Sequence, residues 1–550
     1  MQKSMSRIEK SILWGTGLTS IVVTPFMSYE PINLPRLVIL AIFGVSLILL
    51  VVLHRNDLIK HEHKKILLVL TYFILWSLIS AVFSNLSFMD AFFGVFGRNN
   101  ALLTYLMFVV FTTATIFVSN LRFIRFLLLV LVFIGVLSAT YGLLQSIGID
   151  PFGWISENII VFGFFGNPNF QAAFMGITAT VAFAYLLNKD YKLSIKLGYL
   201  AFICLALYIV YKSKSQQGYL VFIAGVSVVI YLWLRTNPIL KKFRVLYLFA
   251  LGFGVVAVVL DIFQKSPWRS LLYKESVSYR GDFWQAGWNM TISNPVFGVG
   301  LDGYRDNFRL YRDQASADRN PNSFVDSAHN VLLDISSGGG FPLLLIYVTL
   351  LLMVLISARK VIKRSTSFDY NFAALFAAWV AYTAQSVISI QQIGIAIWGW
   401  VLAGAIIGYE INNRKDQPVK LSNRDASEIL VVSAGLIIGL IISLPPFIAD
   451  AQFRSTVFKG DITKIESALQ RWPQNVSNMN FASDLFRKGG FPDQALNMAR
   501  KAVALNPRNF EAWQQVFLSQ NAPEAERNAA LMKMREMDPF NPILKLIQLP

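Results

Sequence analysis

Two residue types suited to chemistry stand in one polar segment, from about 261 to 330, between two apolar runs. His329 closes the segment three residues after Asp326, and Arg280 follows Tyr279 inside it. The free pKa of histidine suits proton transfer near neutral pH, and a guanidinium group binds phosphate through paired hydrogen bonds. We therefore predict His329 and Arg280 as catalytic residues, His329 for proton transfer, and Tyr279 as a substrate-binding neighbour. The alternative for His329 is a structural hydrogen bond at a helix start.

Further arginines could bind a phosphate near this segment. Arg98 lies in Phe93-Gly-Val-Phe-Gly-Arg98-Asn-Asn, which is rich in glycine and aromatic residues. An arginine placed in this way at a membrane surface can reach a lipid headgroup phosphate. Arg305 adds positive charge to the larger segment, together with the arginines at 309, 312 and 319. Contact with phospholipid, or snorkelling, is the alternative for these four later arginines.

Three asparagines are candidates for polar contacts with a substrate. Asn167 and Asn169 flank a proline in Gly166-Asn-Pro-Asn169, which marks a turn before an apolar run. Either could instead cap the helix that follows. Asn330 comes directly after His329.

The polar segments give little sign of a metal site. Asp302 and Asp306 form only an i,i+4 pair, and His61-Glu-His63 stands in a basic stretch without a cysteine or a third ligand. We therefore expect no metal and no cofactor, with arginines providing the charge stabilisation.

The elements that must position these residues are membrane helices. Of the 550 residues, 55% are hydrophobic and 15% are charged, against about 25% charged in soluble domains. The apolar runs are continuous rather than alternating, which predicts an all-α polytopic helix bundle and excludes a barrel. The net charge of +17 is assigned to loops beside membrane helices and not to nucleic-acid binding.

We predict about 13 spanning helices from these runs. They cover residues 12–28, 35–53, 66–84, 101–119, 124–146, 168–187, 194–211, 218–234, 244–261, 338–358, 371–389, 392–410 and 428–448.

Alternate loops between these spans are basic, beginning with Lys3, Arg7 and Lys10 at the N-terminus. Basic loops face the cytoplasm under the positive-inside rule. The pattern predicts a multi-pass protein of the cytoplasmic (inner) membrane with a cytoplasmic N-terminus. The large loop 261–328 and everything after the last span are then extracytoplasmic.

Residues 450–550 have a soluble composition, so we divide the chain into a membrane domain, 1–449, and a tail, 450–550. Prolines at 473, 507 and 539 follow predicted helices and lie 34 and 32 residues apart. This spacing matches tetratricopeptide (TPR) repeats, and a plain helical bundle is the alternative. Helices are predicted at 461–471, 476–488, 492–505, 510–519 and 523–537. A helical array suggests a docking surface.

Taken in order, the motifs resemble the O-antigen ligase/polymerase superfamily. They are Gly97-Arg98, Gly166-Asn-Pro-Asn169, Arg280-Gly-Asp-Phe-Trp284, Asn294-Pro-Val-Phe-Gly-Val-Gly300, Ala328-His329-Asn330 and Gly338-Gly-Gly-Phe-Pro342. The resemblance covers roughly 90–410 and extends to the topology and the TPR-like tail. A family segment of Ser-Arg-Gly type is here Ser213-Lys214-Ser-Gln-Gln-Gly218, which leaves any phosphate contact there to Lys214.

The resemblance implies a GT-C-like membrane glycosyltransferase of the O-oligosaccharyltransferase kind. Such an enzyme moves a glycan from an undecaprenyl-diphosphate carrier to an acceptor on the outer face, with inversion and without a metal. By the same resemblance, Arg280 and Arg98 would hold the diphosphate and His329 would be the general base or would orient the acceptor. The acceptor would be a protein, a lipid or a wall polymer, docked by the tail.

Three other functions are compatible with the sequence. A polymerase would extend the glycan on its carrier, a transporter would move the lipid-linked glycan, and a structural scaffold would use the tail alone. Transporters usually place charged residues at the bilayer midplane, whereas the apolar runs here are almost free of charge.

Overall fold

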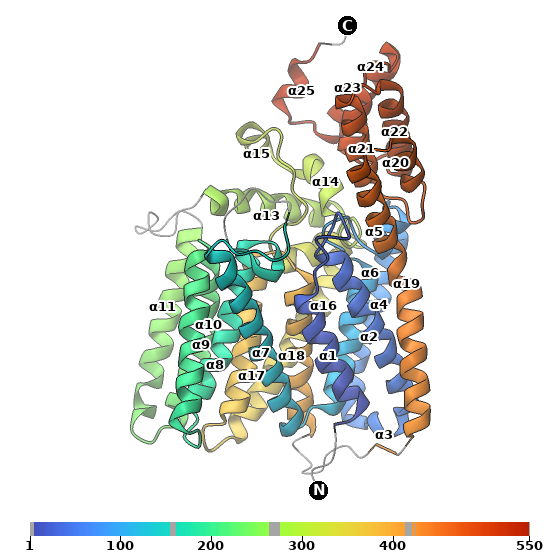
Figure 1. Cartoon of the computed structure of the whole chain (residues 1–550). Coiled ribbons are helices and arrows are strands. Elements are labelled where there is room, and N and C mark those ends of the chain that lie inside the picture. The colour runs from blue at the N-terminus through green and yellow to red at the C-terminus, as the bar shows by residue number, and fades with distance from the viewer. Residues whose placement is uncertain (1–4, 155–160, 263–274, 413–420, 423, 549–550) are drawn as a thin grey trace.

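The computed structural model describes residues 5–154, 161–262, 275–412, 421–422 and 424–548, and gives side chains for these except 258–278. Every regular element within these ranges is helical. Long helices stand side by side in a bundle, and a smaller group of helices extends from one end of it (Figure 1). The expected all-α polytopic bundle is confirmed.

Ten helices in the described part are long and apolar enough to cross a membrane. They are α2 (Asn33–Leu53), α4 (Lys64–Phe83), α7 (Leu121–Ser146), α8 (Pro168–Leu186), α9 (Leu193–Lys212), α10 (Gln217–Thr236), α16 (Val331–Arg364), α17 (Tyr370–Ile388), α18 (Ile393–Asn412) and α19 (Asp425–Lys459). The shorter apolar helix α6 (Leu102–Val118) and the helices α1 (Arg7–Ile21) and α11 (Arg244–Ile262) complete the bundle. Each of the predicted spans therefore has a helix.

Two helices differ clearly from the predicted spans. α1 ends at Ile21 rather than near 28, because Thr24 precedes a proline, which disfavours helical backbone there. α16 begins at Val331, seven positions before the predicted start at 338, and is interrupted at Gly340, where φ is 71°. Residues 331–337 of α16, before this break, lie between the predicted large loop, 261–328, and the predicted span.

The bundle is packed most tightly around α18, whose residues Ile393–Glu410 are all buried. Gly404 and Gly408 allow α6 to approach closely: a Cβ on Gly404 would lie 2.6 Å from the carbonyl oxygen of Thr112. Small residues at such crossings are typical of membrane helix pairs.

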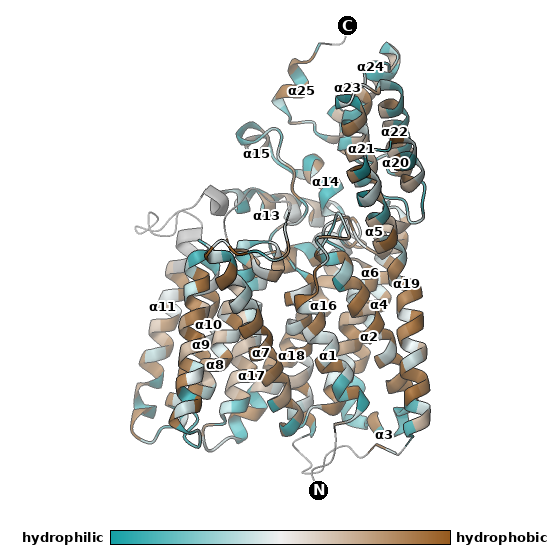
Figure 2. Ribbon diagram, viewed as in Figure 1, coloured by the Kyte–Doolittle hydropathy of each residue, from teal (hydrophilic) through white to brown (hydrophobic). Residues whose placement is uncertain are grey.

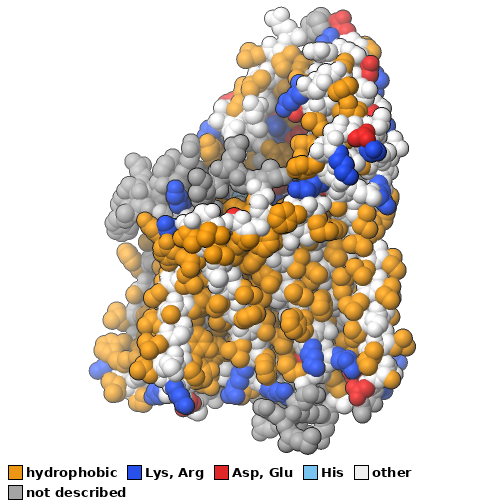
Figure 3. Space-filling view, in the orientation of Figure 1, with side chains coloured by type: hydrophobic (Ala, Val, Ile, Leu, Met, Phe, Trp, Pro, Cys, Tyr) orange, Lys and Arg blue, Asp and Glu red, His pale blue; other side chains and the backbone are white. Residues whose placement is uncertain are grey.

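The two ends of the bundle differ. The N-terminus and α3 (Arg55–Leu58) lie at one end, and α13 (Glu275–Ser293), α14 (Tyr304–Tyr311) and α15 (Gln314–Arg319) lie at the other (Figure 1). The bundle helices are mainly hydrophobic along their length, whereas α14 and α15 carry many polar residues (Figure 2). Basic side chains gather along the end that holds the N-terminus, below a broad apolar surface (Figure 3). The predicted basic loops thus lie opposite the large loop.

The tail continues from α19, which passes from the bundle into the tail without interruption (Figure 1). It contains α20 (Ile462–Leu469), α21 (Val476–Lys488), α22 (Pro492–Leu505), α23 (Phe510–Leu518), α24 (Glu524–Met537) and α25 (Pro542–Leu546). The first five lie within a few residues of the predicted helices. The TPR relationship and the division at 449 stay predictions.

Shorter elements connect these helices. They are α5 (Phe88–Phe92) and the 3-10 turns η1 (His61–His63), η2 (Gly163–Phe165) and η3 (Leu240–Phe243).

Candidate active site

His329 lies in the turn that leads into α16. Asn330 is the N-cap of this helix, and its side-chain oxygen accepts hydrogen bonds from the backbone N–H groups of Leu332 at 3.0 Å and Leu333 at 3.3 Å. His329 itself has φ 55°, the left-handed region that side chains other than glycine rarely adopt. The turn therefore holds the His329 ring in a defined direction at a backbone cost.

Asp334, on the first turn of α16, stabilises this conformation. Its carboxylate accepts hydrogen bonds from the Ser327 hydroxyl and from the backbone N–H of Ala328, both at 2.7 Å. The Ser327 hydroxyl accepts from the N–H of His329 at 3.1 Å. The chain before His329 is thus fastened to the helix after it, which explains why the strained turn persists.

The His329 ring is half-buried and lies among charged groups. Its centroid is 5.3 Å from that of Phe283 on α13. Burial, together with the positive charges of Arg280 and Arg98, lowers the pKa of His329 to about 4, although the charge of Asp326 opposes this effect. The imidazole is therefore neutral at physiological pH and free to accept a proton.

Arg280 lies one turn of α13 before Phe283 and is half-buried, as is Tyr279 beside it. Burial lowers the pKa of Arg280. Within the described part of the chain, no carboxylate forms an ion pair with its guanidinium. A partly enclosed cation of this kind is suited to bind an anion.

Arg98 reaches the same turn from a distant part of the chain. Its Nε donates to one carboxylate oxygen of Asp326 at 2.7 Å, and its Nη2 donates to the other at 2.8 Å. Burial raises the pKa of Asp326, but Arg98 and His329 outweigh this effect, so the pKa is lowered overall. Arg98 is thus committed to a carboxylate in this structure, although it still contributes positive charge near His329.

The turn that carries Arg98 is held by Asp302. One carboxylate oxygen of Asp302 accepts from the backbone N–H of Val95 at 2.8 Å and of Asn100 at 3.1 Å. Burial nevertheless raises the pKa of Asp302 to about 7. Asp302 and Asp306 form an i,i+4 pair in the sequence, but their carboxylates have different partners. Asp302 binds the turn that carries Arg98, whereas Asp306 binds the tail.

A small cavity of about 30 Å³ lies between the carboxylates of Asp302, Asp326 and Asp334. Its other lining residues include Arg98, Asn100 and Gln391. This volume suits one or two water molecules, or a single hydroxyl group. Within the described part of the chain, the side-chain oxygen of Asn100 and the side-chain nitrogen of Gln391 are buried and meet no hydrogen-bonding partner. The cavity is therefore polar and can donate and accept hydrogen bonds.

The segment between α13 and α14 fixes the position of both helices against α16. The N–H groups of Val299 and Gly300 donate to the carbonyl oxygens of Ser337 at 2.8 Å and Gly338 at 2.9 Å. These carbonyls belong to the interrupted part of α16, where the Ser80 hydroxyl also donates to Gly338 at 2.7 Å. The glycines at 338–340 thus allow backbone-to-backbone contact. The carbonyl groups of Ser337 and Gly338 beside the break have hydrogen-bonding partners, as a membrane requires.

The other sequence candidates lie elsewhere. Asn167 caps α8 through the N–H of Asn169 at 2.8 Å, and the side-chain oxygen of Asn169 accepts from Ser215 at 2.7 Å. Lys214, beside Ser215, is exposed and has φ 55°. The contact between Asn169 and Ser215 links the start of α8 to the turn before α10. Arg305 donates to Ser477 of the tail at 2.8 Å.

Sequence reasoning missed Asp334 and Gln391 as parts of the site. Asp334 stands only five residues after His329, between the large loop and the span predicted from 338, and Gln391 stands between two predicted spans. A polar residue inside an otherwise apolar run was the available signal.

Together, these observations define a polytopic helical membrane protein in which His329, Arg280 and Arg98 form a charged cluster at one end of the bundle. Residues 200–348 match the family model described as O-antigen ligase. Over this segment, which includes Arg280 and His329 but not Arg98 or the tail, the chain carries an O-antigen ligase domain. No curated protein matches the chain. The family supports a membrane enzyme that transfers glycosyl groups.

Proposed function

We propose that the chain transfers a glycan from an undecaprenyl-diphosphate carrier to an acceptor on the outer face of the cytoplasmic membrane. The single observation that carries this proposal is the proximity of a neutral, half-buried His329 to the positive charge of Arg280. The match of residues 200–348 to the O-antigen ligase family supports the class of reaction.

In the proposed reaction, the acceptor hydroxyl oxygen attacks the anomeric carbon of the glycan. The bond from this carbon to the diphosphate oxygen breaks, and the electron pair leaves with the diphosphate. A ring nitrogen of His329 takes the proton of the attacking hydroxyl. Attack opposite the leaving group inverts the anomeric centre. General-base catalysis of this kind contributes roughly 10²–10⁴-fold to a rate.

Arg280 stabilises the negative charge that develops on the departing diphosphate. Arg280 lies on α13, so the helix positions its backbone before the reaction begins, and a donor placed in advance stabilises developing charge most effectively. Arg98 adds a second positive charge, while its pairing with Asp326 fixes the turn beside His329.

The experiment is transfer in proteoliposomes from a purified undecaprenyl-diphosphate-linked oligosaccharide, with a cell-envelope fraction as the source of acceptor. Wild type is compared with His329→Ala and Arg280→Ala, and with Arg500→Ala as a matched loss of an exposed arginine, whose partner is Glu526. Transfer is expected to fall by at least roughly 10²-fold in the first two variants and to be unchanged in the third. Equal transfer in all four proteins would refute the site.

The products also separate the alternatives. Glycan attached to a protein, lipid or wall polymer supports the proposed transfer, whereas longer glycans on the carrier identify a polymerase. Movement of intact lipid-linked glycan across the membrane without any new glycosidic bond identifies a transporter.

A further inference from the structure

Helix α14 has two faces with different partners. Tyr304 and Phe308 form its buried face and pack with Ala286 of α13 and with Ala328, the residue before His329. The Tyr304 hydroxyl donates to the carbonyl oxygen of Phe283 at 2.7 Å. Because the ring of Phe283 contacts that of His329, α14 supports a residue that packs directly against His329.

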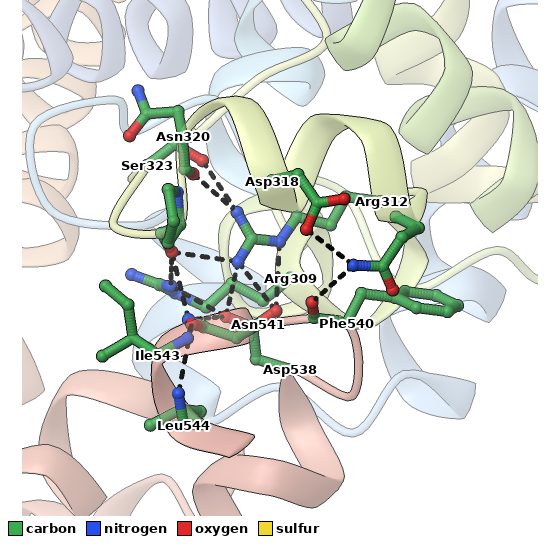
Figure 4. Close-up of polar contacts among 12 residues, drawn as sticks. Arg309, Arg312, Asp318, Asn320, Ser323, Asp538, Phe540, Asn541, Ile543 and Leu544 are labelled. Carbon is green, nitrogen blue, oxygen red and sulfur yellow. Dashed lines mark hydrogen bonds and ion pairs between the residues drawn. The ribbon is translucent and has the colours of Figure 1, made fainter. Parts of the chain in front are cut away.

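The charged face of α14 points to the tail. Arg312 and Asp538 are both completely buried, and Arg312 Nη2 lies 2.7 Å from a carboxylate oxygen of Asp538. Arg309 reaches the same carboxylate at 3.0 Å and lies over the ring of Phe510, 4.1 Å from its centroid. Figure 4 shows the arginines and Asp538 converging with Asn541 between the large loop and the tail. Loss of one partner from a buried charge pair of this kind destabilises the folded protein strongly, because the other charge is left buried without compensation.

The tail makes these contacts with a recurring part of its sequence. Pro473, Pro507 and Pro539 are each followed two positions later by an asparagine. These asparagines cap α21, α23 and α25 and are Asn475, Asn509 and Asn541. The three capping turns therefore occupy equivalent places in successive units of the tail.

Each capping turn contacts a different position along the charged face of α14 and the residue that follows it. Near the first turn, Ser477 accepts from Arg305. At the second, the side-chain nitrogens of Asn506 and Asn509 donate to Asp306 at 2.6 and 3.2 Å. At the third, Asp538 binds Arg309 and Arg312. The side of the tail that presents the three capping turns is thus covered by α14 of the same chain.

The N-terminal end of α14 is linked through Asp302 to the turn that carries Arg98. Asp302 lies two residues before α14 and accepts the two hydrogen bonds from the Arg98 turn. A shift of α14 would therefore displace Asp302 and, with it, the turn that directs Arg98 towards Asp326.

We propose that Asp538 is a positioning residue for the transfer site: it holds α14 through Arg309 and Arg312, and α14 holds Phe283 and the Arg98 turn. The tail is then a part of the catalytic architecture, and an acceptor docked on the tail would use surfaces other than the capping turns. For its effect on the reaction, this inference rests on the proposed function.

The experiment uses the purified full chain with Asp538→Asn and, as a control, Lys533→Ala on the exposed side of α24, where Lys533 pairs with Glu536. Hydrogen exchange is measured over 93–100 and 304–311, and kcat and KM are measured for the lipid-linked donor. Asp538→Asn is expected to speed exchange in both segments and to lower kcat at least tenfold, whereas Asp538→Glu restores both in part and Lys533→Ala changes neither.

If Asp538→Asn does not fold, Asn506→Ala tests the same relationship at the second capping turn, with a smaller change expected in the same direction. Faster exchange in 304–311 without any change in 93–100 would overturn the proposal, as would normal kcat with faster exchange in both. If wild type transfers no glycan, the proposed function fails, and the exchange of 93–100 still decides whether the tail positions the Arg98 turn.

Discussion

Arg98 and Asp326 are 228 positions apart in the chain, yet two nitrogens of the arginine donate to the two oxygens of the carboxylate at 2.7 and 2.8 Å. This fork joins the short 93–100 segment to the turn before His329. Replacement of Asp326 by Asn leaves the guanidinium without its counter-charge, which costs on the order of 1–3 kcal/mol. We expect a lower midpoint of thermal unfolding in detergent and weaker transfer.

Arg98→Lys is the companion variant, because a lysine keeps the charge but cannot form the paired hydrogen bonds. We expect it to retain more stability than Arg98→Ala and to lose transfer nevertheless. Full transfer in Arg98→Lys would show that charge alone matters at this position.

The pH dependence of transfer tests the environment of His329. Its pKa is lowered to about 4, so the neutral base is present above this pH and is lost as pH falls through it. We expect the acid limb of kcat/KM near pH 4 rather than near 6.5. An acid limb at about 6.5 in wild type would mean that the free enzyme does not hold His329 as the structure does.

Arg280→Gln removes one of the positive charges that lower the pKa of His329. The pKa should therefore rise, and the acid limb should move to higher pH in addition to a fall in maximal rate. Arg500→Gln, which removes an exposed arginine of the tail, serves as the control and should leave the acid limb in place.

Gly340→Ala tests the interruption of α16. Gly340 has φ 71°, and a Cβ there would lie 2.2 Å from the carbonyl oxygen of Val296. We expect destabilisation of at least about 1–3 kcal/mol, measured as a lower unfolding midpoint. Gly252→Ala in α11 is the matched control, because a Cβ there meets no atom within 4 Å. Equal midpoints for the two variants would contradict the close contact.

Asp302→Asn tests the buried carboxylate that holds the Arg98 turn. Its pKa is raised to about 7 in the folded state, so its contribution to stability is present at acid pH and is lost as pH rises through about 7. Asparagine can accept the same two hydrogen bonds and does not titrate. We therefore expect the unfolding midpoint of Asp302→Asn to fall less than that of wild type between pH 5 and pH 8.

The amino-acid sequence alone was enough to locate the membrane helices, because continuous apolar runs of about 20 residues have few alternatives to a spanning helix. The sequence also indicated the tail helices. It indicated His329 and Arg280 as candidates because these two polar residues stand out beside apolar runs. Only the tertiary structure decided which charges meet. Ion pairs such as Arg98–Asp326 and Arg312–Asp538 depend on how distant segments pack, and residue spacing along the chain carries no information about that. The same packing showed Asn167 and Asn330 as helix caps, turned Arg305 to the tail, and brought Asp334 into contact with the turn before His329.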